Sequence, residues 1–390
     1  MPPRILLATI LRAQGANGVI TATNSLLHSF KKAGYDAELL TPFDASPLIF
    51  FPLFAVRSLV RPVSKNTGVW WHRHFHAVVL RSVLAEKLKD GRETIIFAQC
   101  PVSAKAAMDV LDPSRHVLAL AVHFNHSQAE EWRDQGLIRE NDWAWKSCKR
   151  LDEEVFPAVD RFLYVSDYSR RHIEAQYPDL AKKPAMTGID YVSSQGNARR
   201  DLSRATRDLV SVGSLEPRKN QIFLLRVLRA ARDLGHEPTL TIVGCGPDLR
   251  QLQREAERLG IAGQVHFFGE SSDVFPCLAR HKVYVHAATM ESFGFSLIEA
   301  MSIGMPVVAA PVGGIPEVFT DGVEGRYWPL DDAETAARIL VDILQDDARL
   351  EYMGLAAKQR FLKCFEESIV FPRVADFLLE GCTVEHQTEI

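Results

Sequence analysis

The chain has 390 residues, too many for one ordinary hydrophobic core, so its length predicts two domains of about 150–200 residues each. With 47% hydrophobic and 24% charged residues and a net charge of −4, it reads as a globular protein without the broad basic excess of a nucleic-acid-binding protein. No run of about 18 apolar residues occurs, which argues against a membrane-spanning helix.

Short apolar stretches alternate with amphipathic helical patterns along the chain. Strands are expected at 5–9, 37–41, 94–98, 117–122 and 161–165, and again at 209–213, 239–243, 264–268, 283–286 and 306–310. Helices are expected at 19–33, 219–234, 246–259, 296–303 and 366–381. This βα alternation, which restarts after a polar linker near 185–206, predicts two doubly wound α/β domains with parallel sheets. We place the domains at 1–187 and 188–372, and the last helix and tail, 373–390, can pack on either.

Polar and glycine residues follow the predicted strands of the first half. "RAQGANG" (12–18) comes after the first strand, and Gly15 and Gly18 would let backbone N–H groups approach a phosphate at the next helix. A plain βα turn remains the alternative. "VHFNH" (122–126) places His123 at a strand end, where it is either a structural histidine or a ligand-binding one. In open parallel sheets, ligands bind beyond the carboxyl ends of the strands.

"SPLIFFPLFAVRSLVRPVSK" (46–65) is apolar and aromatic, with Arg57, Arg61 and Lys65 toward its end. A buried helix or a patch between subunits is the simpler interpretation; an acceptor pocket or a membrane-surface contact is the functional one. The next stretch, "WWHRHFH" (70–76), contains three histidines, but a helix would split them between faces. We therefore expect no metal site there.

Two loops of the second half contain charged residues or glycines that could bind a ligand. In "VGSLEPRKNQ" (212–221), Arg218 and Lys219 precede a helix, an arrangement that suits a diphosphate or, alternatively, a solvated helix start. In "GCGPD" (244–248), two glycines stand without the third that a nicotinamide-binding fingerprint requires, which weakens a dehydrogenase interpretation.

The stretch "ESFGFSLIEA" (291–300) holds two carboxylates separated by seven residues, Glu291 before a helix and Glu299 within it. We expect 292–296 to precede and cap that helix. If the segment were fully helical, the two glutamates would lie about 12 Å apart along it. A retaining glycosidase needs its carboxyl groups about 5–5.5 Å apart. The pair therefore more closely suits two hydrogen-bond acceptors that bind separate parts of one long ligand.

Together these stretches resemble the retaining glycosyltransferases of the GT4 family, which have the GT-B fold of two Rossmann-like domains facing across a cleft. The resemblance is strongest over 209–330, where "GSLEPRKN", "VGCGP", "HFFGESSDV" and "ESFGFSLIEAMSIGMPVVAAPVGGIPEV" carry it. The first half matches more loosely, through "GANG", His123, "VSDYS" and "TGID". The resemblance implies an acceptor-binding N-terminal domain and a C-terminal domain that binds a nucleotide-sugar donor.

The resemblance also implies roles for single residues. Arg218 and Lys219 would bind the diphosphate, aided by the loop of Gly15 and Gly18, and His123 would touch the donor sugar near the reacting carbon. Many relatives carry arginine directly after the glycine of the diphosphate loop and glycine after its lysine. This chain has Ser214 and Asn220 at those positions, and we expect Arg218 to supply the missing cation.

The carboxylates and backbone of the second half would bind the rest of the donor. The resemblance implies that Glu291 contacts the donor sugar and Glu299 the ribose hydroxyls. The remaining predicted contacts are N–H groups of Gly294, Phe295 and Ser296 beside the sugar, and backbone around Gly269, Glu270 and Val274 against the base.

The predicted activity is transfer of a hexosyl group from a UDP- or GDP-linked sugar to a small-molecule, glycan or lipid-linked acceptor, with retention. Fixed cations can stabilise the departing diphosphate, so neither a metal nor a bound cofactor is expected. A disaccharide phosphorylase or synthase of the same fold, or a catalytically silent sugar-nucleotide-binding subunit, stays open. The six cysteines form no C-x-x-C pair, so we expect reduced, mostly buried thiols in a cytoplasmic protein. The segment 46–65 can attach this protein to the inner face of the membrane.

Overall fold

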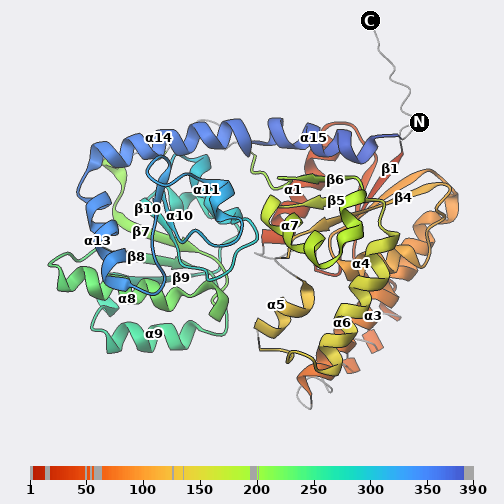
Figure 1. The fold of residues 1–390 in the computed structure, drawn as a ribbon, viewed down its shortest axis with the longest axis horizontal. Coiled ribbons are helices and arrows are strands. Elements are labelled where there is room, and N and C mark those ends of the chain that lie inside the picture. Colours follow the sequence, from red (N-terminus) through yellow and green to blue (C-terminus); the bar gives the residue numbers. More distant parts are fainter. Residues whose placement is uncertain are drawn as a thin grey trace, which may run out of the picture. The chain divides into compact units, whose positions relative to one another are not determined.

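The computed structural model describes residues 3–13, 18–48, 51–52, 55–56, 64–124, 127–134, 136–193, 200 and 202–381. Contacts between residues divide it into two compact units. The first includes Val19–Ile189 and the chain from Phe371, and the second includes Asp190–Val370 (Figure 1). The corresponding boundaries predicted from the sequence are 187/188 and 372/373.

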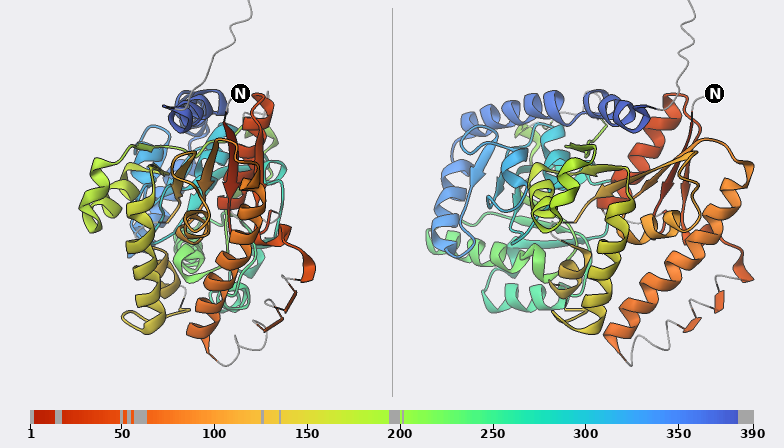
Figure 2. Two further views of the ribbon diagram at one scale, coloured as in Figure 1. Left: turned by 90° about the vertical axis from the view of Figure 1, so that its right-hand side faces the viewer. Right: turned by 45° about the vertical axis from the view of Figure 1, so that its right-hand side comes forward.

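The first unit is built on a sheet of parallel strands. They are β1 (Arg4–Ala8), β2 (Ala37–Leu40), β3 (Thr94–Ala98), β4 (His116–Val122), β5 (Arg161–Tyr164) and β6 (Ala185–Thr187). Their order across the sheet is β2-β1-β3-β4-β5-β6. The helices between them are α1 (Gly18–Lys32), α3 (Lys65–Lys87), α4 (Pro101–Met108), α5 (Gln128–Asp134), α6 (Trp143–Val155) and α7 (Asp167–Gln176). Helices α3 and α6 lie side by side in both views of Figure 2.

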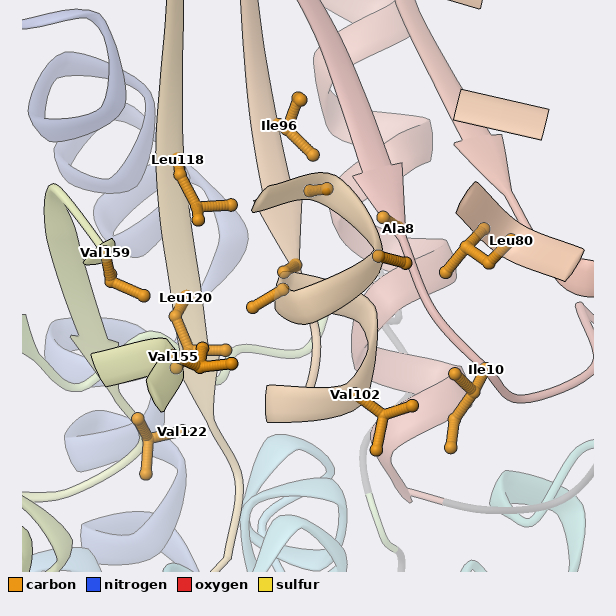
Figure 3. Close-up of a cluster of buried hydrophobic side chains, with 14 of the residues drawn as sticks. Ala8, Ile10, Leu80, Ile96, Val102, Leu118, Leu120, Val122, Val155 and Val159 are labelled. Atoms are coloured by element: carbon orange, nitrogen blue, oxygen red, sulfur yellow. The ribbon is translucent and has the colours of Figure 1, made fainter. Parts of the chain in front are cut away.

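Buried aliphatic side chains fill the space between this sheet and its helices (Figure 3). Leu118, Leu120 and Val122 alternate along β4 and therefore project from the same face of the strand. They belong to the same buried cluster as Ile96 of β3 and Val155 of α6. Strands β1 and β3 are buried at every residue, as expected for a parallel sheet that helices cover on both faces.

The second unit repeats the architecture with another parallel sheet. Its strands are β7 (Arg207–Val212), β8 (Leu240–Val243), β9 (Val265–Gly269), β10 (His281–His286), β11 (Val307–Ala309) and β12 (Gly325–Tyr327). Their order is β12-β11-β10-β7-β8-β9. Its helices are α8 (Gln221–Asp233), α9 (Leu249–Arg258), α10 (Phe275–Leu278), α11 (Phe295–Ser302), α12 (Ile315–Val318), α13 (Ala333–Leu344) and α14 (Asp347–Cys364), followed by α15 (Glu367–Leu379). The predicted fold class, two doubly wound parallel α/β sheets, is therefore confirmed.

Side-chain caps fix the starts of several helices. In each, an oxygen at the N-cap accepts a hydrogen bond from a backbone N–H of the first turn, which would otherwise lack an intrahelical partner. The caps are Ser64 for α3, Asp142 for α6, Ser166 for α7, Asp332 for α13 and Asp346 for α14. Local sequence thus determines where these helices begin.

The structure corrects part of two predictions about the fold. The expected linker at 185–206 begins with β6, which pairs with β5 as the edge strand of the first sheet. The described residues of 46–65 do not form a buried helix, since Leu48 is 88% and Phe51 is 72% exposed. Residues 49–50, 53–54 and 57–63, which include Arg57 and Arg61, lie outside the described part of the chain.

The last helix, α15, belongs to both units along its length. Its residues from Phe371 onward group with the first unit. There Phe371 packs edge-to-face on Phe30 of α1, with ring centroids 5.0 Å apart, and Arg161 of β5 donates to the backbone carbonyl of Leu378 at 2.9 Å. None of the described helices is both long and apolar enough to cross a membrane.

Candidate active site

The crossover point of the second sheet lies between β7 and β10. The chain leaves β7 toward β8 and β9 on one side, whereas β10, β11 and β12 build up the other side. In open parallel sheets, ligands bind beyond the carboxyl ends of the two strands at such a point. The loops that follow β7 and β10 carry Arg218 and Lys219 in the one and Glu291 in the other.

The loop after β7 has a backbone that explains one departure from the family pattern. Pro217–Lys219 form a 3-10 turn, and Asn220 follows in the left-handed region, with φ 51°, before α8 begins at Gln221. Glycine is the usual residue for that conformation, and asparagine is among the few others that adopt it readily. Asn220 therefore preserves the turn that presents Lys219.

The "GCG" loop after β8 packs directly against the backbone of the loop after β7. A Cβ atom on Gly244, whose φ is 138°, would lie 2.0 Å from the carbonyl oxygen of Gly213. A Cβ atom on Gly246 would lie 2.2 Å from the carbonyl oxygen of Leu215. Because the backbones approach this closely, both positions require glycine for packing, which accounts for the glycine pair without a dinucleotide.

Cations and a histidine converge on one oxygen of Glu291. Lys219 Nζ lies 2.5 Å from Glu291 Oε2, His286 Nε2 lies 3.2 Å from it, and Arg218 NH1 lies 3.8 Å from it. Arg218 NH1 also donates to the backbone carbonyl of Met290 at 3.2 Å. The structure thus brings together three of the four residues predicted as catalytic, and adds His286.

Burial and charge set the protonation states in this cluster. Burial alone would raise the pKa of Glu291, but Lys219, His286 and Arg218 hold it well below its usual range, so the carboxylate is ionised. Burial lowers the pKa of His286, so its imidazole is neutral and its Nε2–H can donate to Glu291. Burial, with the charge of Glu291 as a second cause, raises the pKa of Asp190 to about 7.

Glycines of "PVGG" hold the backbone of Glu291. Its carbonyl oxygen accepts a hydrogen bond from the N–H of Gly314 at 2.9 Å. A Cβ atom on Gly313, whose φ is 59°, would lie 2.0 Å from that same oxygen. The loop after β11 therefore fixes where the Glu291 side chain starts.

Helix α11 begins at Phe295, one residue before the predicted start, and its N-cap lies within the segment 292–296 that was predicted to cap it. The N-cap is Gly294, with φ 104° and no side-chain cap. The backbone N–H groups of Phe295 and Ser296 open the helix, where N–H groups have no intrahelical acceptor and favour anionic or polar ligands. The Tyr284 hydroxyl donates to Ser296 Oγ at 2.7 Å, which ties the helix start to β10.

Glu299 lies on α11, half-buried, and makes no ion pair with any other described residue. Burial, followed by the nearby charge of Asp273, raises the pKa of Glu299 to about 8. A carboxyl group in this state favours a ligand that brings hydrogen-bond donors, since they would stabilise the ionised form.

The backbone predicted to contact the base follows β9. Gly269 ends that strand with φ 85°, and its carbonyl accepts from the N–H of Gly244 at 2.7 Å. Glu270 is exposed, and Val274 directly precedes α10. These residues follow the carboxyl end of β9 and Lys219 follows that of β7, so in this parallel sheet both lie at the same edge.

Comparison with known proteins assigns the chain to a family. The family model described as glycosyl transferases group 1 matches residues 197–360. Over 351 residues the chain is 34% identical to a phosphatidyl-myo-inositol mannosyltransferase of Mycolicibacterium smegmatis, covering 88% of this chain and 85% of the relative. A second such enzyme, from Mycobacterium leprae, is 31% identical over 92% of this chain and 91% of its own length. The chain belongs to the group 1, or GT4, glycosyltransferases.

Solved structures share the GT-B fold of this glycosyltransferase. HepE from Anabaena, in complex with UDP and glucose, superposes with a TM-score of 0.68 at 16% identity, over 96% of this chain and 99% of that one. Sucrose-phosphate synthase from Thermosynechococcus elongatus gives a TM-score of 0.71 at 15% identity, over 96% and 98%. At these identities the likeness shows the fold alone.

The first unit of the glycosyltransferase presents an uncharged group at the end of β4. His123 Nε2 lies 3.1 Å from Gln99 Oε1, whose amide in turn donates to the carbonyl of Phe97 at 3.2 Å. Thr23 of α1 donates to the same Gln99 oxygen at 3.3 Å. Burial lowers the pKa of His123 to about 4, so its imidazole is neutral. Gly18 is the first residue of α1, and Gly15 lies outside the described residues.

Sequence reasoning missed Gln99, Asp190, His286, Gly313 and Gly314. One signal was available: His286 is the last residue of a predicted strand, the same position that singled out the neighbourhood of His123. The others depend on contacts between distant segments.

Among the described residues no group of three His, Cys, Asp or Glu side chains could hold a metal ion, and the histidines of 70–76 all lie on α3. The five described cysteines are free thiols, and Cys245 is exposed.

Proposed function

We propose that this glycosyltransferase moves a mannosyl group from a nucleotide-diphosphate sugar to a hydroxyl of a lipid-linked acceptor, with retention of configuration and without a metal. Two relatives that the chain covers over at least 85% of their length are phosphatidyl-myo-inositol mannosyltransferases. Another relative, 30% identical over 56% of this chain and 62% of its own length, is named as GDP-mannose-dependent. GDP-mannose is therefore the first donor to test, and UDP-linked sugars are the second.

The observation that carries the proposal is the cluster of Lys219, Arg218 and Glu291 at the crossover point of the second sheet. The two cations can bind the diphosphate of a nucleotide sugar, and the ionised carboxylate beside them can accept hydrogen bonds from its sugar. The ammonium of Lys219 has three N–H donors, so it can keep Glu291 and still reach a phosphate oxygen. A silent sugar-nucleotide-binding subunit would not need this set intact.

The chemistry that the cluster favours is departure of the diphosphate. When the bond between the anomeric carbon and the phosphate oxygen breaks, its electron pair stays on that oxygen, where negative charge develops. Lys219, Arg218 and the N–H groups at the start of α11 would stabilise this charge. The acceptor oxygen attacks the same face and its proton passes to the departing phosphate, so configuration is retained. His123 stays a predicted contact of the donor sugar.

Glu299 is proposed to bind the ribose. Ribose hydroxyls donate hydrogen bonds, and two of them would favour the ionised form of a carboxyl that burial now keeps protonated near neutral pH. Backbone around Gly269, Glu270 and Val274 is proposed to bind the base, and Gly294 permits close approach to the sugar.

A lipid-linked acceptor also gives the segment 46–65 a role. The exposed side chains of Leu48 and Phe51 would insert at the bilayer surface, which places the enzyme at the inner face of the membrane. Vesicle sedimentation of the wild type and of Leu48→Ser/Phe51→Ser tests this, and equal binding of the two would remove the role.

The activity test uses the purified chain, GDP-[14C]mannose and vesicles containing phosphatidylinositol, in the presence of EDTA. We expect labelled lipid whose new linkage has the donor's configuration by NMR. Transfer to added inorganic phosphate instead would indicate a phosphorylase, and donor binding without any turnover would indicate a silent subunit. An inverted product, or full loss of activity with EDTA, would contradict the mechanism.

A further inference from the structure

We propose that His286 is a positioning residue for the donor sugar: it holds one oxygen of Glu291, so that the other faces the ligand. The inference rests on the proposed function, because it assumes that Glu291 binds a sugar hydroxyl. Nothing in the motifs of the sequence assigned a role to this histidine.

The two oxygens of Glu291 are in different situations. Oε2 receives Lys219 at 2.5 Å, His286 at 3.2 Å and Arg218 at 3.8 Å. Oε1 forms no hydrogen bond or ion pair with another described residue, yet it is absent from the fully buried, unpaired polar atoms of the described chain, so solvent still reaches it. Oε1 is therefore the oxygen that can accept from a ligand hydroxyl.

A carboxylate needs a second, fixed donor to keep its oxygens distinct. The terminal torsion of glutamate is broad and roughly two-fold, so rotation exchanges the two oxygens. Lys219 has a long flexible chain and cannot by itself prevent this exchange. The imidazole of His286 is rigid, only 2% exposed, and reaches Oε2 from a different element, the end of β10.

The backbone of His286 is held from the β11 side of the strand. Its carbonyl accepts from the indole N–H of Trp328 at 3.2 Å, and its backbone pairs with Ala309 of β11. The ring of Tyr284 lies roughly parallel to its ring, with centroids 6.3 Å apart. The charged groups that face the imidazole are Glu291, Lys219 and Arg218.

A neutral donor suits this place better than a charged one. A third cation beside Lys219 and Arg218 would repel both, whereas leucine would leave Oε2 with the flexible lysine and the more distant arginine. Burial keeps His286 neutral, so its Nε2–H donates without altering the charge of the cluster.

The test compares two ligands, GDP-mannose and GDP, on three proteins by calorimetry: the wild type, His286→Leu and His286→Gln. The leucine variant loses the donor, and one lost hydrogen bond corresponds to about tenfold weaker binding of GDP-mannose. GDP affinity should stay within about twofold, because GDP lacks the sugar. The glutamine variant keeps an N–H donor and should recover most of the loss. UDP-glucose and UDP form the matched second pair.

A double-mutant cycle separates positioning from general structural support. If His286 acts through Glu291, then His286→Leu should have no further effect on GDP-mannose affinity in a Glu291→Gln background. An equal loss for GDP and GDP-mannose, an unchanged factor in that background, or no recovery by a folded glutamine variant would overturn the inference alone. If wild-type protein binds no nucleotide sugar at all, the proposed function fails and the inference with it.

Discussion

The two sheets of this glycosyltransferase share a way of building but differ in what they present at their carboxyl edges. Numbered within each unit, the second sheet has the order 3-2-1-4-5-6 and the first has 2-1-3-4-5-6. Each unit places a neutral histidine at or next to a strand end, the buried His286 in one and the partly buried His123 in the other. His286 donates to an ionised carboxylate beside two cations, whereas His123 lies beside the uncharged amide of Gln99. The fold thus provides the place, and a few loop residues decide whether that place is charged.

The largest expected effect comes from removing the charge of the second unit. Lys219→Ala should lower kcat by about 10²–10³-fold, since one lost donor to a developing oxyanion corresponds to about 3–4 kcal/mol. Steady-state kinetics with GDP-mannose measure this. Thermal denaturation must accompany the assay, because Glu291 would lose its closest cation.

The control for charge is Lys182→Ala, which removes an exposed lysine of the first unit that is paired with Asp179. Exposed ion pairs contribute about 0–1 kcal/mol, so its kinetics should match the wild type. Near-normal turnover of Lys219→Ala would show that the difference in charge between the two edges is not catalytic.

The next effect concerns the packing beneath the loop after β7, which carries Arg218 and Lys219. Gly244→Ala would drive a Cβ atom to 2.0 Å from the Gly213 carbonyl in a left-handed backbone. We expect a loss of at least about 2 kcal/mol of stability, or several degrees in Tm. Gly263→Ala is the matched control, since nothing lies within 4 Å of its added Cβ. Equal melting temperatures would mean that the two loops can separate without cost.

The pH dependence of nucleotide binding sharpens the comparison further. Glu299 has a pKa of about 8 without ligand, above its usual value, so the protonated form is favoured at neutral pH. Ribose hydroxyls favour the ionised form, so binding should release a proton and GDP affinity should rise as the pH increases from about 6 to 9.

Glu299→Gln should abolish this dependence and leave only the titration of the phosphate itself. Calorimetry in buffers of different ionisation enthalpy measures the released proton directly. The same variant should be more stable than the wild type at pH 9, because a carboxyl with a raised pKa loses stabilisation as the pH rises from about 4.5 to 8. Proton release that is unchanged in Glu299→Gln would remove the ribose assignment.

The smallest effect is expected in the first unit. His123→Gln keeps a hydrogen-bonding group beside Gln99, and no charge is lost because the pKa of His123 is about 4. We expect a fall in kcat of about tenfold or less, with GDP affinity unchanged and no altered slope of the pH profile above pH 6. A loss of kcat as large as that of Lys219→Ala would mean that the essential chemistry depends on the carboxyl edge of the first sheet, where His123 lies.

The elements that sequence predicted well are those with strong local signals. The strand at 94–98 follows from an apolar run, and the helix predicted at 219–234 corresponds to α8, which begins at Gln221 after a charged turn. Strands β6 and β12 were not predicted: each has only three residues, and neither stands in an apolar run like the one that marks the equally short β11.

For the site, the charged residues were predictable and their partners were not. Lys219, Arg218 and Glu291 stand in recognisable loops, and their type alone points to a phosphate or a sugar. The roles of His286 and Gly313 arise from burial and from backbone contacts between segments far apart in sequence, which periodicity does not report.

The passage of α15 into the first unit affects how the protein is made. The unit that a ribosome produces first is not complete until the chain beyond Phe371 has emerged, because that segment supplies the partner of Phe30 and the carbonyl that Arg161 holds. During synthesis, the amino-terminal half therefore waits with part of its apolar surface uncovered while the whole second unit is translated. Translation speed and chaperone access should matter more for this half, although it is the earlier one.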